Sequence, residues 1–417
     1  MLVERNREFS TVCVVGLGYI GLPTAATLAS AGFEVKGIDV AEHIVEELNE
    51  GRAHFSEPDL DMLVRGAVSS GRLTAYTEPQ AADAFIITVP TPIRDDKSPD
   101  MSYVEAATRA VAPVLQPGNL IILESTSPLG ATEDMAGIIR ELREDLVDGE
   151  ELSVSLAYCP ERILPGQMVR ELVENDRIVG GITPHDARRA GQLYESIVRG
   201  EIHMTDAKTA ELVKLIENAY RDVNIAFANE VANVAEAHGL NPWEAIGLAN
   251  RHPRVNILNP GPGVGGHCIA VDPWFLISAD PDKAKLMAEA RRVNDGRPEA
   301  VVAKIKKACR EHGTDKVACM GLAFKPDVDD LRESPAVDIA IALAKDGFEV
   351  YAVEPHVNAL PEKLWRYDNI RLAGLDESLA KVGVVALLVA HKAFVKRASD
   401  IKDKHVIDAV GLWGGTR

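Results

Sequence analysis

Cys268 is a candidate nucleophile, because it follows the most unusual stretch of the chain, the glycine- and proline-rich run 260–266. A thiolate is reactive near neutral pH, so a cysteine on a shaped loop can trap an aldehyde covalently. The alternative is a small buried residue, the interpretation that we give to Cys13, Cys309 and Cys319. The carboxyl group of Asp272, four residues on, favours the catalytic hypothesis, whereas we interpret His267 as structural.

One further polar pair and one glutamate could assist such a nucleophile. Lys214 and Asn218 are four residues apart in a helical pattern, which places them on one face, where they could donate hydrogen bonds to an oxyanion. A solvated polar face is the alternative. Glu161 follows an expected strand, where active-site groups of open α/β sheets collect, although it could equally be a surface carboxylate.

A glycine motif indicates a dinucleotide site. Gly16, Gly18 and Gly21 follow an apolar run in the spacing that permits a tight turn, close approach of a pyrophosphate and close helix packing. Asp39 stands 18 residues after Gly21, where a carboxylate accepts hydrogen bonds from a ribose diol and repels a 2′-phosphate. A structural turn is the alternative; the pattern favours NAD over NADP.

The elements that must position these residues alternate between strand and helix at both ends of the chain, which predicts parallel α/β architecture. In the first part the expected strands are 11–15, 34–38, 84–89, 120–124, 153–158 and 177–180, with a helix over 23–31. In the last part they are 316–321, 349–353, 382–389 and 405–408. Between the two parts, 206–238 contains no proline or glycine and predicts one long helix that connects domains or subunits.

Length and charge limit the function. A chain of 417 residues is expected to form two or three domains, and its net charge of −18 argues against nucleic-acid binding. The longest apolar run, 382–390, is too short to span a bilayer, and the first ten residues lack a signal-peptide core. Five scattered cysteines without a CxxC pair suggest neither zinc nor disulfides. We therefore expect a cytoplasmic protein without membrane insertion or metal.

Seven blocks of sequence resemble the UDP-glucose/GDP-mannose dehydrogenase family over essentially the whole chain. They are VVGLGYIGLP, VPTP (89–92), ESTSPLG (124–130), CPERILPG (159–166), ELVKLIENAYRDVNIAFANE (211–230), PRVNILNPGPGVGGHCIAVDPWFL (253–276) and GLAFKPDVDDLRESPA (321–336). The resemblance implies two Rossmann-like doubly wound domains joined by a long central helix in an all-α dimerisation core. The implied boundaries are an NAD-binding domain over 1–200, a central helical domain over 201–305 and a UDP-sugar-binding domain over 306–417.

The resemblance also implies a reaction, the four-electron oxidation of a sugar C6 alcohol to a carboxylate with two NAD⁺ in turn. The block ending in VDPWFL resembles the branch that acts on UDP-N-acetyl-D-mannosamine, with the UDP forms of N-acetylglucosamine or glucose as alternatives. The partners implied are that UDP-sugar and a second copy of the chain in a homodimer. Two other classes stay open: a two-electron 3-hydroxyacid dehydrogenase, which needs no cysteine, and a non-catalytic nucleotide-sugar sensor.

Matched residue by residue, the resemblance assigns roles within this reaction. Cys268 matches the family nucleophile, Lys214 its oxyanion-stabilising lysine and Glu161 its general base. Asn218 matches the helix partner of that lysine, and Asp272 the aspartate that supports lysine and water.

The remaining matches concern the two ligands. Thr126 matches a threonine that orders water near hydride transfer, and Arg251 and His252 fall where a neighbouring subunit reaches the sugar pocket. The implied cofactor contacts are Gly16, Gly18, Tyr19, Ile20, Gly21, Asp39, Thr91 and Thr126. The implied substrate contacts are Arg162, Lys214, Asn218, Arg251, His252, Gly265, Lys325 and Arg332.

Overall fold

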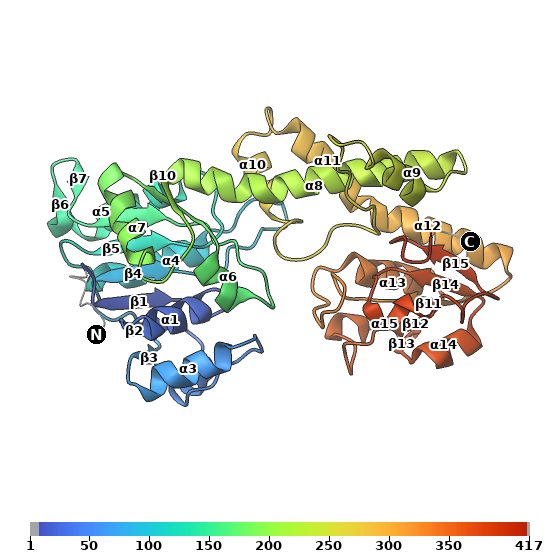
Figure 1. The fold of residues 1–417 in the computed structure, drawn as a ribbon, viewed down its shortest axis with the longest axis horizontal. Helices are drawn as coiled ribbons and strands as arrows, with labels where there is room; N and C mark the ends of the chain where they lie inside the picture. The colour runs from blue at the N-terminus through green and yellow to red at the C-terminus, as the bar shows by residue number, and fades with distance from the viewer. Residues whose placement is uncertain (1–7, 415–417) are drawn as a thin grey trace. The chain divides into compact units, whose positions relative to one another are not determined.

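The computed structural model describes residues 8–414, which form two compact units, each built around a mostly or wholly parallel sheet (Figure 1). The first unit comprises the residues up to 216 together with 274–279, and the second comprises 217–273 and the residues from 280 onward. The domain boundaries expected near residues 200 and 305 stay predictions. Within 8–414 we find no helix with the length and apolar character needed to cross a membrane.

The first sheet has eight strands in the order β10-β9-β8-β5-β4-β1-β2-β3. β9 runs antiparallel to β8, and the other neighbours pair in parallel. Its central strands are apolar throughout because helices cover both faces, so that residues pointing either way are buried. The strands are β1 (Thr11–Val15), β2 (Glu34–Ile38), β3 (Leu73–Tyr76), β4 (Ala84–Ile87), β5 (Leu120–Leu123), β8 (Ser155–Tyr158), β9 (Arg177–Gly181) and β10 (Ile202–Asp206).

Alternate residues of the strands build two cores, one on each face of this sheet. In β1, Val12 and Val14 join the core that contains Leu22 and Leu60, whereas Cys13 and Val15 join the opposite one. The helices of this unit are α1 (Gly21–Ser30), α2 (Glu42–Asn49), α3 (Leu60–Ser69), α4 (Ser102–Val111), α5 (Ala131–Leu142), α6 (Met168–Glu174) and α7 (Pro184–Tyr194). A two-stranded hairpin, β6 (Val147–Asp148) with β7 (Glu151–Leu152), follows α5.

The second sheet has five parallel strands in the order β13-β12-β11-β14-β15. Both of its faces are covered, and the order reverses beside β11, as it does beside β1 in the first sheet. The strands are β11 (Lys316–Met320), β12 (Glu349–Val353), β13 (Ile370–Leu372), β14 (Val384–Leu387) and β15 (His405–Asp408). The helices that pack with them are α12 (Arg297–Glu311), α13 (Pro335–Lys345), α14 (Leu375–Lys381) and α15 (Lys392–Val395).

One long helix, α8 (Ala207–Ala237, 31 residues), begins in the first unit and continues in the second (Figure 1). It is followed by α9 (Pro242–Ala249), α10 (Asp272–Ala279) and α11 (Lys285–Asp295). Residues 250–271, between α9 and α10, contain no helix or strand. We call this segment the cysteine loop, because it carries Cys268.

The structure confirms the predicted α/β class, the two Rossmann-like sheets and the long helix. The first helix begins at Gly21 rather than at the predicted 23, because Leu22 N–H already bonds to Gly18 O (3.1 Å). The sequence analysis missed β3, β10 and β13. They lie at or next to sheet edges, where little of a strand must be apolar.

Candidate active site

The three glycines after β1 serve three different purposes, as the motif predicts. Gly16 has φ +94°, and a Cβ there would lie 3.0 Å from Thr88 O. A Cβ on Gly21 would overlap the carbonyl oxygen of Gly16, so the turn closes tightly onto α1. Gly18 has no neighbour within 4 Å of its Cβ position, which leaves space beside the start of α1. A pyrophosphate fits such a space, where helix N–H groups favour negative charge.

Asp39 directly follows β2 and lies beside this turn. Its Oδ2 accepts a hydrogen bond from Leu17 N–H (3.0 Å) and its Oδ1 accepts one from Ala41 N–H (2.9 Å). Each carboxylate oxygen has a second lone pair, so the held side chain can still accept bonds from a ribose diol. The Tyr19 ring, about half exposed, packs 4.5 Å from that of Phe55 in the same region.

The loops after β4 and β5 carry the two predicted threonines. Thr91 and Thr126 are both partly buried. Ser125 Oγ donates to Val89 O (2.6 Å), and Ser127 Oγ donates to Ser125 O (2.8 Å). The first bond joins the two loops, and the second lies within the loop after β5. Both lie beside the point where the strand order reverses, which is where ligands of open α/β sheets bind.

Glu161 follows β8 on a tight loop in which its side chain accepts a hydrogen bond from Ile163 N–H. Burial raises the pKa of Glu161, and the ammonium group of Lys214 opposes that rise. Lys214 itself is only 6% exposed. A carboxyl group whose pKa lies above its ordinary range is suited to accept a proton near neutral pH.

A buried polar cluster beside this loop was not predicted. Tyr194 Oη donates to Glu124 Oε1 (2.6 Å), and Arg177 Nη1 lies 3.8 Å from both that oxygen and Cys159 Sγ. Burial raises the pKa of Glu124 despite the nearby arginine, and it raises the pKa of Cys159 to about 11. Cys159 is therefore a protonated structural thiol, and the cluster anchors the start of the Glu161 loop. The only sequence signal was a charged residue at the edge of each of two buried strands.

The second group of predicted residues lies in the second unit. Asn218 Nδ2 donates to Asp272 Oδ2 (2.5 Å), and both side chains are at least 96% buried. Asp272 begins α10, and its N–H donates back to Cys268 O (2.8 Å). The backbone of Cys268 is thus linked through Asp272 to α8. Lys214 lies one turn before Asn218 on the same helix, so α8 carries residues of both groups.

Cys268 is exposed, whereas the other four cysteines are buried. The glycines before it allow close packing against the segment that follows β11. A Cβ on Gly265 would overlap Glu333 O, and one on Gly266 would lie 2.9 Å from the Phe324 ring. The glycine-rich run therefore shapes the loop against 324–335 and leaves its only thiol accessible.

That same segment carries the predicted nucleotide-binding residues. Arg332 donates two bonds to Asp330, from Nε (2.9 Å) and from Nη2 (2.7 Å). His267 Nε2 lies 3.8 Å from Asp330 Oδ2, which connects this segment to the cysteine loop. A cavity of about 490 Å³ adjoins it, lined by Asp329, Asp330, Leu331, Arg332, Glu333, Val357, Ala359, Leu360, Pro361 and Lys363. Lys325 stands over the Phe324 ring at 5.6 Å.

Arg162, Arg251 and His252 are the remaining predicted substrate contacts. Arg162 Nη2 donates to the carbonyl oxygen of Asp176 (2.5 Å), in the first unit. Arg251 and His252 are exposed just after α9, and His252 Nδ1 accepts a bond from Arg254 N–H (3.3 Å).

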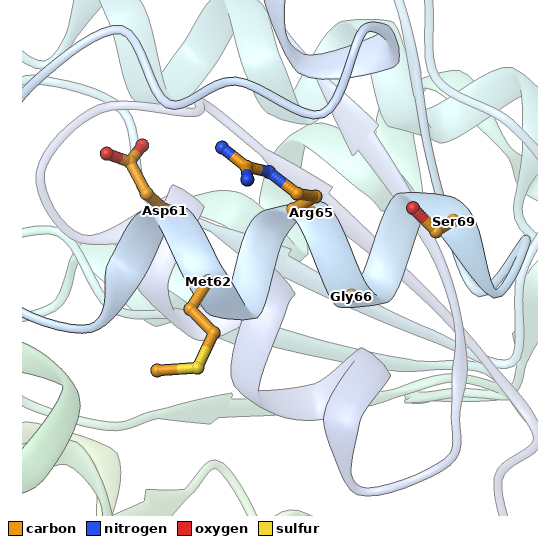
Figure 2. Close-up of a pocket in the computed structure, with 5 residues that line it drawn as sticks. All are labelled: Asp61, Met62, Arg65, Gly66 and Ser69. Carbon is orange, nitrogen blue, oxygen red and sulfur yellow. The ribbon is translucent and has the colours of Figure 1, made fainter.

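Two other features lie outside the site. A cavity of about 470 Å³ lies on α3 and is lined by Asp61, Met62, Arg65, Gly66 and Ser69 (Figure 2), none of which is a predicted site residue. The donor atoms of Asp327, His356 and His391 lie within 4.8 Å of one another. However, His391 Nδ1 already accepts from Asp327 N–H (2.9 Å), and its Nε2 faces Glu354 Oε2 (3.0 Å). Its nitrogens are thus engaged, and the group does not fit a metal.

The chain is similar to known proteins over nearly its whole length. Profiles of the UDP-glucose/GDP-mannose dehydrogenase family match in order: the NAD binding domain at 10–198, the central domain at 208–296 and the UDP binding domain at 318–414. The chain is 54% identical over 399 residues to the UDP-N-acetyl-D-mannosamine dehydrogenase of Campylobacter jejuni, covering 94% of this chain and 98% of that protein. It is 53% identical over 416 residues to the NDP-N-acetyl-D-galactosaminuronic acid dehydrogenase of Ralstonia nicotianae, covering 98% of each.

Solved structures agree with this likeness. The UDP-D-ManNAc dehydrogenase of Pyrococcus horikoshii superposes with a TM-score of 0.86 at 37% identity, covering 96% of each chain. The UDP-N-acetyl-mannosamine dehydrogenase Cap5O of Staphylococcus aureus gives 0.85 at 40% identity, covering 96% of this chain and 94% of that one. With three domain matches in order and relatives more than half identical, the chain belongs to the UDP-glucose/GDP-mannose dehydrogenase family.

Proposed function

We propose that this NAD-dependent dehydrogenase oxidises the C6 alcohol of UDP-N-acetyl-D-mannosamine to the uronic acid through a thioester on Cys268. The observation that carries the proposal is the exposed thiol, whose backbone is tied through Asp272 and Asn218 to α8. One turn earlier on that helix, Lys214 acts on a glutamate whose pKa burial raises. Mannosamine relatives at 54% identity, and solved mannosamine enzymes at 37% and 40%, support the sugar.

The first oxidation step produces an aldehyde. NAD⁺, when bound beside the Gly16–Gly21 turn, accepts one hydride in each of the two oxidations. Lys214 and Asn218 donate hydrogen bonds to the C6 oxygen and stabilise the alkoxide that forms as the alcohol loses its proton. Thr126 and Asp272 hold the water that carries this proton away.

Cys268 supplies the covalent steps. Its thiolate adds to the aldehyde carbon, the carbonyl oxygen takes a proton, and a thiohemiacetal results. Loss of the second hydride from C6 and of the hydroxyl proton leaves a thioester. Water, deprotonated by Glu161, then adds to the thioester carbon, the thiolate leaves, and the uronic acid is released. Because the aldehyde stays bound to sulfur, it does not escape between the two oxidations.

The proposed ligand contacts fall into two sets, one for NAD and one for the UDP-sugar. We assign NAD to Gly16, Gly18, Tyr19, Ile20, Gly21, Asp39, Thr91 and Thr126. We assign the UDP-sugar to Arg162, Lys214, Asn218, Gly265, Lys325 and Arg332, with Arg251 and His252 reaching it from a second subunit. The exposed positions of Arg251 and His252 support this last assignment.

A homodimer through α8 completes the proposal. Five large apolar side chains on one face of this helix are between 38% and 67% exposed: Leu212, Ile216, Tyr220, Phe227 and Val234. Their spacing of 4, 4, 7 and 7 residues keeps them on one stripe of the helix. Apolar stripes of this length are typically covered by another surface, here a second copy of the chain.

A cytoplasmic location is supported by the cysteines. All five lie within 8–414, where no disulfide is formed. A chain that depends on a reactive thiol needs a reducing compartment to preserve it.

The proposal is tested with the purified chain, NAD⁺ and a panel of UDP-sugars. We expect two NADH per UDP-N-acetylmannosamine and poor turnover of UDP-glucose and UDP-N-acetylglucosamine. One NADH per substrate would point to a two-electron dehydrogenase, and binding without NADH to a sensor. UDP-N-acetylgalactosamine is the second candidate, because a galactosaminuronic acid dehydrogenase is 53% identical to this chain. Faster turnover of that sugar would overturn the mannosamine assignment.

A further inference from the structure

The long helix α8 has an exposed apolar stripe, as described above, and a buried face on which polar residues lie among alanines and Leu215. The buried polar residues are Glu211, Lys214, Asn218, Asp222 and Asn229. These five side chains are at most 6% exposed, and their spacing of 3, 4, 4 and 7 residues places them on one face. Buried polar groups are costly unless each finds a partner, so this face is expected to serve as an anchor for other segments.

Asn229, the last of these polar residues, takes part in a chain of hydrogen bonds that all run in one direction. We call this chain, which links Gly261, Asn229, Asn294 and Asp222, the relay. Gly261 N–H donates to Asn229 Oδ1 (2.9 Å), and Asn229 Nδ2 donates to Asn294 Oδ1 (2.8 Å). Asn294 Nδ2 donates to Asp222 Oδ1 (2.8 Å) and to Asp222 O (3.0 Å). Each amide accepts with its oxygen and donates with its nitrogen, so neither amide can flip without opposing donor to donor.

A charged pair closes the chain. Arg291 Nη1 donates to Asp222 Oδ1 (2.6 Å), and both side chains are at least 97% buried within the second unit. Burial raises the pKa of Asp222, and Arg291 and Asn294 oppose that rise. A carboxylate at the end of a row of amides polarises them and strengthens each bond. The relay therefore joins α8, α11 and Gly261 into one rigid group.

Gly261 is the point at which the cysteine loop is fixed from both sides. Arg297 Nε, from α12, donates to Gly261 O (3.0 Å), while the relay holds its N–H. Cys268 lies seven residues later, and the next bond back to α8 is that between Asp272 and Asn218. The loop that carries the nucleophile is thus suspended between two anchor points on the same helix face.

We propose that Asn229, Asn294 and Asp222 are positioning residues for Cys268, which they hold in place through Gly261. The inference rests on the proposed function, because it assumes that Cys268 must reach C6 of the sugar. Its anchoring component, however, can be measured without catalysis.

The test compares Asn229→Ala with two matched controls. Asn224→Ala removes an asparagine of the same helix whose Nδ2 bonds to Tyr220 O. Asn119→Ala removes a buried asparagine of the first unit that does not touch the loop. Amide hydrogen exchange is followed on the peptide that covers 257–268, together with the melting temperature, the KM for NAD⁺, and aldehyde released per NADH formed.

We expect exchange of the 257–268 peptide in Asn229→Ala to quicken at least tenfold, with little change in either control. Acid formation should fall by about ten- to a hundredfold, free aldehyde should appear, and the KM for NAD⁺ should stay within twofold. Asn294→Ala keeps the bond between Gly261 and Asn229, so it should give an intermediate effect, and it replaces Asn229→Ala if that variant does not fold.

If amide exchange of the 257–268 peptide is unchanged in Asn229→Ala, the relay does not anchor the cysteine loop. Faster exchange with normal acid formation and no free aldehyde would overturn the positioning role. A failure of the proposed function can be told apart from these outcomes. The unsubstituted chain would then form no uronic acid, whereas exchange of the loop would still be faster in Asn229→Ala.

Discussion

Both sheets have a glycine turn after their first strand, and the two turns differ in how far protein groups fill them. In both, a glycine follows the first strand of the pair: Gly16 with φ +94° and Gly321 with φ +83°. The N–H of each donates to the last residue of the neighbouring strand, Ile38 O and Val353 O, at 2.8 Å. In both, a carboxylate after that strand accepts from the next backbone N–H, Leu17 N–H (3.0 Å) and Leu322 N–H (2.7 Å).

The carboxylates differ in what else they bind. Asp39 is partly buried and bonds two backbone N–H groups, one on each oxygen. Glu354 is 5% exposed and accepts from Leu322, Ala323 and His356 N–H, while His391 Nε2 lies 3.0 Å away. The first carboxylate keeps capacity for a ribose diol, whereas the second is saturated by protein.

The residues after each glycine differ as well. The first turn continues through Gly18 directly into α1 at Gly21, whereas the second continues through Phe324 and Lys325, and α13 begins only at Pro335. The second turn therefore presents a loop with a lysine where the first presents open helix N–H groups. The same fold supports different ligands because a few side chains decide what the turn can accept.

The largest effect on this comparison is expected from Gly21→Ala. The added Cβ would overlap Gly16 O, so the turn must open and NAD⁺ should lose its site. We expect NADH formation to fall by about a thousandfold, roughly 4 kcal/mol, and calorimetry to detect no NAD⁺ binding. Gly18→Ala is the matched control, because its Cβ meets no protein atom. Gly18→Ala should leave the melting temperature unchanged and lower only the affinity for NAD⁺. Normal NAD⁺ affinity in both variants would show that NAD⁺ does not bind at this turn.

Substituting the carboxylate of each turn in separate variants tests whether the two turns serve different ligands. Asp39→Asn puts an amide nitrogen against a backbone N–H and removes the charge, so kcat/KM for NAD⁺ should fall by about 10- to 100-fold and the preference over NADP⁺ should narrow. Glu354→Gln should instead raise the KM for the UDP-sugar, because it loosens the loop that carries Lys325. Each variant is the control for the other. Equal effects of either change on both ligands would contradict the division of roles.

A smaller effect distinguishes Glu161 from Glu354, because their pKa values are shifted in opposite directions. Burial raises the pKa of Glu161, so its ionisation destabilises the fold as pH rises above the unfolded value, roughly 4.3. Burial acts to raise the pKa of Glu354 too, but the hydrogen bonds from His391 and Leu322 outweigh it and lower the pKa. Its stabilisation is present at neutral pH and is lost as pH falls through the folded pKa.

Melting curves at pH 7 and pH 4 test this difference. Glu161→Gln should be more stable relative to the parent at pH 7 than at pH 4, and Glu354→Gln less stable. A difference of 1 kcal/mol corresponds to about 2–4 °C in units of this size. If the melting temperatures of both variants, relative to the parent, change in the same direction between pH 4 and pH 7, the two pKa values are not shifted in opposite directions.

Much of this architecture could be predicted from the sequence, because it depends on local pattern. The strands 11–15, 34–38, 349–353 and 405–408 have the predicted bounds, since each has a short run rich in buried apolar residues that marks a strand. The placement of Lys214 and Asn218 four residues apart on one helix followed from the helical pattern. Glu124, Arg177 and Tyr194 were missed, as was the relay from Gly261 to Asp222. These contacts join residues tens of positions apart, and no local pattern encodes them.

The central claim is that Cys268 carries the sugar through the second oxidation. The direct measurement is NADH formed and acid released by Cys268→Ser, with mass spectrometry of the cysteine-loop peptide in acid-quenched Glu161→Gln. Cys159→Ser is the control, because that buried thiol stays protonated. We predict a loss of turnover of about a thousandfold in Cys268→Ser, since a hydroxyl is a far weaker nucleophile, near-normal Cys159→Ser, and a sugar-nucleotide acyl adduct on Cys268. A Cys268→Ser enzyme that still releases acid at near-normal rate, with no adduct in Glu161→Gln, would contradict the account.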